Sequence, residues 1–273
     1  MAIRWIRRWQ PDREIILVGD GTYAAVRLVK ECRDMRPAVK LVSRLRLDAA
    51  LYDPPQPQPG SKRGPKPQKG ARQPSLADVL VDPATVWQSV TVPWYGGADK
   101  QIEIVSGRSL WHRSGHAPVP ICWVLMRCPD DPHFKPTALF CSDQDAPACQ
   151  IITWFVGRWN IEVTFEEVRA HLGFETQRHW SQRAIERTAP CLFGIFSLVV
   201  VMAKLLHPEP ESLPIRQDSW YVKHQATFSD ALAAVRRHLW CAWNYEDSAP
   251  APRPLQFPAQ ISGPLLDALC YAA

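Results

Sequence analysis

The sequence predicts an α/β protein with a helical C-terminal part, and three features of the chain indicate this class. A strand, a helix and a second strand follow one another near the N-terminus. Short alternating apolar runs separated by Gly and Pro fill the middle, and long apolar or amphipathic segments dominate the rest. With 273 residues and 46% hydrophobic content, the chain is long enough to bury a core.

The first region is predicted to be a βαβ unit. Residues 14–18 form a short apolar run typical of a buried strand, which a turn containing Asp20 ends. Residues 23–32 carry apolar side chains at helical spacing, and residues 38–47 return to a strand rich in Val and Leu. Such a unit places Asp20 at the carboxyl edge of a parallel strand pair, where functional residues collect.

The segment 54–74 is strongly basic. Its Pro and Gly residues exclude a helix or central strand, which predicts an extended, mobile loop. Such a loop suits contact with phosphates, although a solubilising linker has the same composition. The segment holds no acid, and its five basic residues equal the formal net charge of +5: Lys62, Arg63, Lys66, Lys69 and Arg72.

The following region, residues 85–143, predicts a mostly antiparallel β segment in which Trp87, Trp94, Trp111 and Trp123 pack the sheet. Helices then dominate. We expect one long helix from Pro147 to Gly173, a second over residues 180–207, a third capped by Ser229 and a short closing helix. The uncharged run "TAPCLFGIFSLVVVMA" fits a buried core helix, with a membrane span as the weaker alternative.

Cysteine usage and the N-terminal sequence point to the cytosol. Eight cysteines occur without a CxxC pair, which indicates reduced thiols rather than a zinc ribbon or a disulfide framework. The first twenty residues carry charge on both sides of a very short apolar run, so they do not predict a signal peptide.

One helical segment, "FVGRWNIEVTFEEVRAHLG", combines charge with many apolar groups. Phe155, Arg158, Glu162 and Arg169 are separated by three, four and seven residues, which places them on one helix face. A charged face is usually solvated. Apolar residues nearly all round, however, predict a buried helix, in which an Arg and a Glu need a functional reason.

This segment resembles the glutamate-bearing helix of the DDE transposases of bacterial insertion sequences. One subgroup has a signature of Tyr, two residues, Arg, three residues, Glu, six residues and Lys. Arg158 and Glu162 match it, while Phe155 and Arg169 are similar replacements. The resemblance continues through "LVGDGTYAAVRLV", "RLRLDAALY" and "QRHWSQRAIERTAPCLFGIFSL", and so covers nearly the whole chain.

The resemblance implies an RNase H-like core interrupted by a β-rich insertion and followed by a helical part. It implies cleavage and strand transfer of DNA by two Mg²⁺ or Mn²⁺ ions about 4 Å apart, held by three carboxylates. Asp20 and Glu162 would be metal ligands, and Arg158 and Arg169 would contact the transposon ends or orient Glu162. The domains expected are 1–50, partial core; 51–75, basic loop; 76–143, insertion; 144–210, helical end of the core; and 211–273, C-terminal helices.

The first of the three acids is the difficult one. Because a helix follows Asp20 at once, Asp20 resembles the family's second acid, so we expect an N-terminally truncated transposase with little activity alone. The alternative is a complete triad of Asp20, Asp143 and Glu162, although Asp143 is also an ordinary residue at a helix entry.

Truncation would also leave an unpaired strand edge, which predicts poor solubility or a need for a partner. The expected partners are DNA and either a second copy or a complementing N-terminal piece, in the bacterial cytoplasm and away from membranes. A rival interpretation is a non-catalytic DNA-binding remnant that competes with intact transposase.

Overall fold

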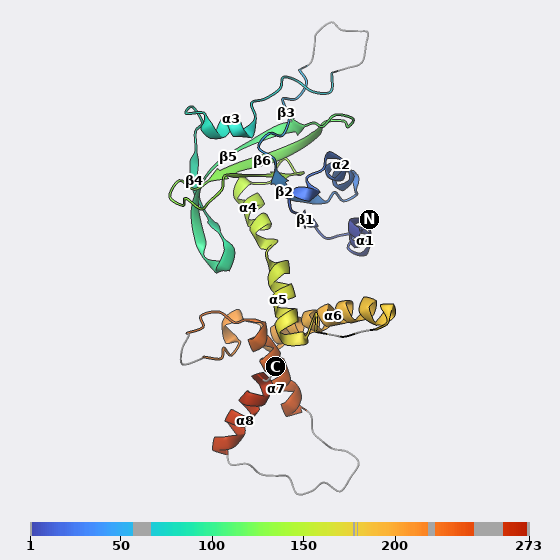
Figure 1. Cartoon of the computed structure of the whole chain (residues 1–273), viewed down its shortest axis with the longest axis vertical. Helices are drawn as coiled ribbons and strands as arrows, with labels where there is room; N and C mark the ends of the chain where they lie inside the picture. The colour runs from blue at the N-terminus through green and yellow to red at the C-terminus, as the bar shows by residue number, and fades with distance from the viewer. Residues whose placement is uncertain are drawn as a thin grey trace. The chain divides into compact units, whose positions relative to one another are not determined.

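The structure is a computed structural model that describes residues 2–56, 67–176, 178, 180–217, 222–242 and 259–271. Figure 1 shows its elements along the chain. The chain divides into two compact units, Met1–Asn160 and Ile161–Ala273. Lys62, Arg63 and Lys66 of the basic segment lie outside the described residues.

A seven-stranded mixed sheet forms the first unit, in the order β1-β2-β7-β6-β5-β3, with β4 also paired to β5. β1 and β2 are parallel, which confirms the predicted βαβ unit, and every other pairing is antiparallel. The elements are α1 (Ala2–Trp9), β1 (Ile16–Val18), η1 (Gly21–Tyr23), α2 (Val26–Asp34), β2 (Lys40–Leu45), β3 (Leu51–Tyr52), α3 (Leu76–Val81), β4 (Gln88–Pro93), η2 (Tyr95–Gly97), β5 (Asp99–Trp111), β6 (Val119–Arg127), β7 (Thr137–Cys141) and α4 (Ala148–Gly157).

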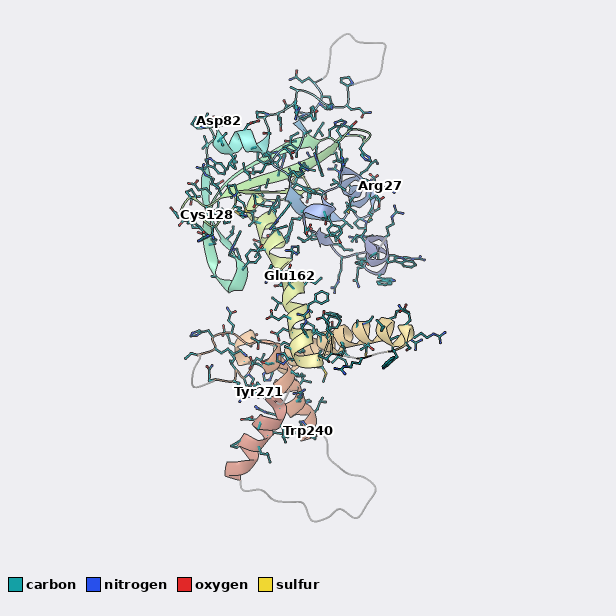
Figure 2. All side chains as sticks on the ribbon, viewed as in Figure 1. Arg27, Asp82, Cys128, Glu162, Trp240 and Tyr271 are labelled. Carbon is teal, nitrogen blue, oxygen red and sulfur yellow. The ribbon has the colours of Figure 1, made fainter. Side chains whose placement is uncertain are left out.

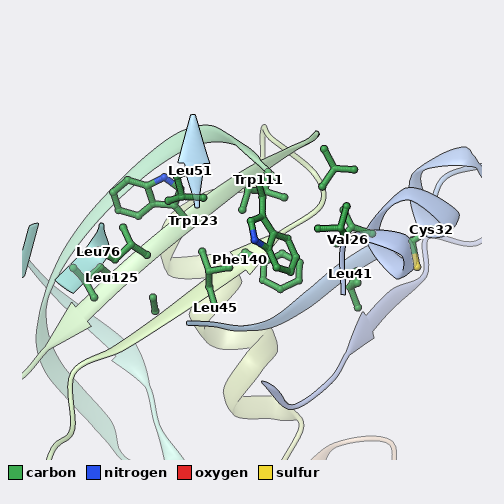
Figure 3. Packing of buried hydrophobic residues seen from close by; sticks show 14 of the residues in the cluster. Val26, Cys32, Leu41, Leu45, Leu51, Leu76, Trp111, Trp123, Leu125 and Phe140 are labelled. Atoms are coloured by element: carbon green, nitrogen blue, oxygen red, sulfur yellow. The ribbon is translucent and has the colours of Figure 1, made fainter. Parts of the chain in front are cut away.

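Alternation along the strands sends side chains to two cores, one on each face of the sheet. In β2, Leu41 and Leu45 pack with α1, α2 and α3, whereas Val42 packs with α4 on the opposite face. Figure 3 shows the first of these cores, in which Phe140 and Trp111 lie beside Leu41. Packed side chains and helices therefore cover both faces of the sheet.

Helices build the second unit: α5 (Asn160–Leu172), α6 (Gln182–Leu206), η3 (Pro210–Ser212), α7 (Phe228–Ala242) and α8 (Ala259–Tyr271). A small core joins α6 to α7, where Phe196 stacks on Phe228 with ring centroids 4.5 Å apart. Asp230 of α7 is fully buried and ion-paired to Lys223, and it accepts a hydrogen bond of 3.1 Å from the Tyr271 hydroxyl. This carboxylate ties α7 to α8 and to the segment before α7.

Two predictions about the helix at 147–173 are wrong. The single helix is two: α4 ends at Gly157 and α5 begins at Asn160. The burial expected for its charged part is also absent, because Val168 is the one buried residue of α5. Gly157 is a poor helix former, and the spacing of the apolar residues alone does not reveal this.

Two further predictions on the helical part need correction. α6 is not a buried core helix, because only 11% of its apolar window is buried. It is long and apolar enough to cross a membrane by length and composition, criteria that core helices of soluble proteins also meet. Ser229 does not cap α7 but lies inside it, one residue after its first residue, Phe228.

Candidate functional site

Asp20 lies just beyond the carboxyl end of β1, where the sequence predicts it. Its side chain caps η1: Oδ1 accepts hydrogen bonds from the Thr22 amide at 2.7 Å and the Thr22 hydroxyl at 3.0 Å. The Ser43 hydroxyl of β2 donates to the Asp20 carbonyl at 2.6 Å. A Cβ on Gly19 would meet the Tyr23 Cβ at 2.7 Å, so glycine permits this turn. Local structure therefore fixes the Asp20 carboxylate.

The Asp20 carboxylate is exposed and ionised. Hydrogen bonds from the amide and then the hydroxyl of Thr22 hold its pKa below the ordinary value, and the charges of Arg158 and Arg44 act in the same direction. Among the described residues, none donates a hydrogen bond to Asp20 Oδ2. One carboxylate oxygen is thus open to a ligand such as a hard cation.

Two arginines and one phenylalanine accompany Asp20 in the first unit. Phe155 of α4 is buried, and its ring centroid lies 5.5 Å from the Arg44 guanidinium and 5.9 Å from that of Arg158. Arg158 forms the C-cap of α4 with helical backbone angles. Phe155 therefore has a packing role, in which its ring lies beside two cations near Asp20.

Glu162 and Arg169 belong to the second unit. Glu162 is exposed in the first turn of α5, as Figure 2 shows, and Arg169 lies seven residues later on the same face of that helix. The Arg169 Nε donates to Glu175 at 2.7 Å, and this ion pair raises the pKa of Arg169. Glu162 is therefore an exposed carboxylate in the first turn of α5, and Arg169 is paired with Glu175.

Asp143 lies apart from Asp20 in the first unit. β7 runs antiparallel to β2, and Asp143 follows it opposite the start of β2, where it pairs with Lys40 at 2.8 Å. Asp20 instead lies beside Ser43, three residues further along β2. Three residues of strand span roughly 10 Å along the backbone, so the two aspartates are anchored at separate places on β2. The ion pair with Lys40 gives Asp143 a structural role.

Two members of the basic segment are described. Arg72 is exposed and bridges Tyr52 of β3 through its backbone. The ammonium of Lys69 lies 3.9 Å from the centroid of the Tyr52 ring and 3.1 Å from Nδ1 of His112. Part of the segment is thus fixed against the sheet, which composition alone does not indicate.

Arg44 was not predicted from the sequence; the parallel pairing of β1 and β2 brings it near Asp20. β2 also contains Lys40 and Ser43, so an arginine in this strand does not stand out in the sequence. Tyr52 and His112 were also missed. Neither carries a local motif, and only strand pairing across the sheet joins them.

The donor set fits a hard cation in part. Asp20 and Glu162 are exposed carboxylates, the ligand type that Mg²⁺ and Mn²⁺ prefer. In the part of the chain that the structure describes, no group of three or more His, Cys, Asp or Glu side chains is placed to hold a metal. Asp20 belongs to the first unit and Glu162 to the second, and the described residues of neither unit form a complete set.

A mixed sheet with helices on both faces and an aspartate at the end of a parallel strand is consistent with an RNase H-like α/β fold. Residues 1–190 match the transposase DDE domain, and the chain belongs to that family. Comparison with curated proteins finds no match to this sequence.

Proposed function

We propose that this chain cleaves DNA and transfers strands at insertion-sequence ends, with Asp20 and Glu162 as two of three metal-binding carboxylates. Family membership supports the reaction class. The observation that carries the residue assignment is the state of Asp20: its carboxylate is exposed and ionised, and it lies at a strand end beside Arg44 and Arg158.

Asp20 and Glu162 would hold Mg²⁺ or Mn²⁺, which supplies activation of the attacking hydroxyl and stabilisation of the leaving oxygen. The covalent chain limits the distance between Arg158 and Glu162. Glu162 follows Arg158 by four residues, so their Cα atoms are at most about 14 Å apart in any arrangement. Arg158, whose charge acts on Asp20, is well placed to attract the scissile phosphate.

The third carboxylate would come from a strand added at the free edge of β1. Lys40 N–H donates to Ile15 O at 3.0 Å, and Gly19 N–H donates to Val42 O at 2.9 Å. In a parallel ladder, alternate residues face the neighbour, so the backbone groups of Ile16 and Val18 point away from β2. No described strand pairs there. Such an edge accepts another strand, from a complementing polypeptide or a second copy.

Localised radical chemistry tests the shared metal site without requiring cleavage activity. Fe²⁺ replaces Mg²⁺, ascorbate and peroxide generate hydroxyl radicals, and mass spectrometry maps backbone cuts in the full chain. We expect cuts near both Asp20 and Glu162 that excess Mg²⁺ suppresses. Glu162→Gln should remove both sets, whereas the control Glu166→Gln on the same exposed helix should retain them. Cuts confined to one of the two regions would contradict the proposal.

A second candidate is a non-catalytic DNA-binding protein, and the incomplete carboxylate set of the described residues favours it. The two candidates differ in DNA chemistry. Catalysis predicts Mg²⁺-dependent nicking of supercoiled DNA, lost in Glu162→Gln, and weak until the third carboxylate is supplied. The binding role predicts salt-sensitive binding that Glu162→Gln leaves unchanged. In either case we propose that the protein works on DNA in the bacterial cytoplasm.

A further inference from the structure

A pocket of about 590 Å³ opens beside the loop that carries Asp20. Gly21, the residue after Asp20, forms part of its wall together with Ala24, Lys69 and residues at or just beyond the ends of β2, β3 and β5. This volume lies within the range of roughly 300–1,000 Å³ that is typical of small-ligand sites. All of the residues that line it are described and belong to the first unit.

One side of the pocket is an aromatic and cationic cluster. The Lys69 ammonium lies 3.9 Å from the Tyr52 ring centroid, and the Tyr52 and His112 rings meet edge to face at 5.8 Å. Lys69 Nζ is also 3.1 Å from His112 Nδ1. No described carboxylate forms an ion pair with Lys69. The protein thus holds this cation in place with aromatic groups and leaves its charge uncompensated.

His112 adds a neutral donor. Burial and the neighbouring Lys69 charge lower the pKa of His112, so the imidazole is neutral at pH 7. Since Lys69 donates to Nδ1, we assign the proton to Nε2. A neutral ring with one N–H suits a base edge or a phosphate oxygen.

The charge of the lining is positive. Asp48 is the acid among the lining residues, and both of its carboxylate oxygens bond Arg46, at 2.8 and 2.6 Å. The charges of Asp48 and Arg46 therefore cancel, and Lys69 and Arg113 are the cations available to an anion. Arg113 is exposed at the rim, where it can attract a charged ligand before it enters.

We propose that this pocket binds one nucleotide of a DNA strand, with its phosphate on Lys69 and Arg113 and its base against Tyr52 and His112. Cations beside aromatic rings are the combination that binds single-stranded nucleic acid. The inference rests on the proposed function for the identity of the substrate. It extends that function because a nucleotide held here would lie against Gly21, the residue after Asp20, and would position the strand for cleavage.

Fluorescence anisotropy of labelled dT10 with the full chain tests the pocket. Lys69→Gln and Tyr52→Leu should each weaken binding about fivefold or more, since stacking on an aromatic contributes about 1–3 kcal/mol per base. The matched control Lys30→Gln removes the same charge from an exposed helix position and should change Kd less than twofold. Circular dichroism checks that each variant is folded. Equal Kd values for Lys69→Gln and Lys30→Gln would overturn the proposal.

Free dTMP serves to separate a strand site from a mononucleotide site. If the pocket takes a nucleotide within a strand, dTMP should displace labelled dT10 only at concentrations at least about tenfold higher than unlabelled dT10. Displacement at equal concentrations would contradict a strand site.

The two proposals fail in different ways. If Lys69→Gln binds dT10 as tightly as the wild type does, the pocket proposal is wrong and the metal-site proposal is unaffected. If binding depends on Lys69 but the radical cuts occur near only one of Asp20 and Glu162, the metal-site proposal is wrong and the pocket proposal is unaffected.

Discussion

The two units of this chain are built on different balances of apolar and polar interaction. The first buries apolar residues on both faces of one sheet, and its largest side chains are fully enclosed. The second has a small core between α6 and α7, while Leu198, Val201 and Leu205 of α6 are more than half exposed. A buried carboxylate, Asp230, organises its other contacts. The apolar content of a segment therefore does not by itself predict that the segment is buried.

The polar centre of the second unit should give the largest effect. Asp230 bonds the amides of Thr227 and Arg216 as well as Lys223. Asp230→Asn leaves the partly buried Lys223 without its counter-charge and should cost about 3–5 kcal/mol of the unfolding free energy of the second unit. Hydrogen exchange of the α7 amides measures this loss. Unchanged protection of α7 would show that apolar packing alone holds the unit.

The pH dependence of the unfolding free energy of the second unit provides a control for the Asp230→Asn variant. Burial alone would raise the pKa of Asp230, but Lys223 and the amides of Thr227 and Arg216 outweigh it and lower the pKa. A lowered folded pKa gives stability that is complete above the unfolded value of about 3.9 and is lost as pH falls through the folded value. Asp230→Asn should therefore flatten the acid limb of the stability curve.

A matched pair of phenylalanines compares the two cores directly. Phe140→Ala should destabilise the first unit by about 3–5 kcal/mol, because the side chain is fully buried between helices and sheet. Phe228→Ala should cost the second unit less, since the small core around it can collapse into the space. Urea unfolding followed by hydrogen exchange in each unit gives both values. Equal losses would contradict the contrast between the cores.

The smallest expected effect is at the apolar surface of α6. Leu205 is 75% exposed, so Leu205→Glu should change the unfolding free energy by less than about 0.5 kcal/mol. It should reduce self-association in sedimentation experiments, because it breaks an exposed apolar stripe. The control Val199→Glu changes a buried residue of the same helix and should unfold the unit. A large loss for Leu205→Glu would show that this surface is covered.

The sequence predicted those parts of the fold that local patterns determine. Alternation identified the antiparallel strands, and the apolar run before Asp20 identified β1. The prediction that α6 is buried was wrong, since composition does not show whether a neighbour covers a helix. The break after Gly157, where no proline marks the end of α4, was also missed.

The candidate site divides in the same way. Asp20 was predictable because a strand, a turn and a helix are local in sequence. The approach of Arg44 depends on the register between β1 and β2, and the Tyr52–His112 contact depends on β3 pairing with β5. Such contacts join residues far apart in the chain, and a sequence pattern does not encode them individually.

Mn²⁺ binding to the full chain, measured by electron paramagnetic resonance, tests directly whether Asp20 is a metal ligand. The measurement compares Asp20 with Asp143. Asp20→Asn should weaken Mn²⁺ binding at least about tenfold, as expected for loss of a ligand. Asp143→Asn should change it less than twofold, because that carboxylate is paired with Lys40 at the other end of β2. The reverse result, with Asp143 required and Asp20 dispensable, would contradict the assignment of Asp20 to the metal site.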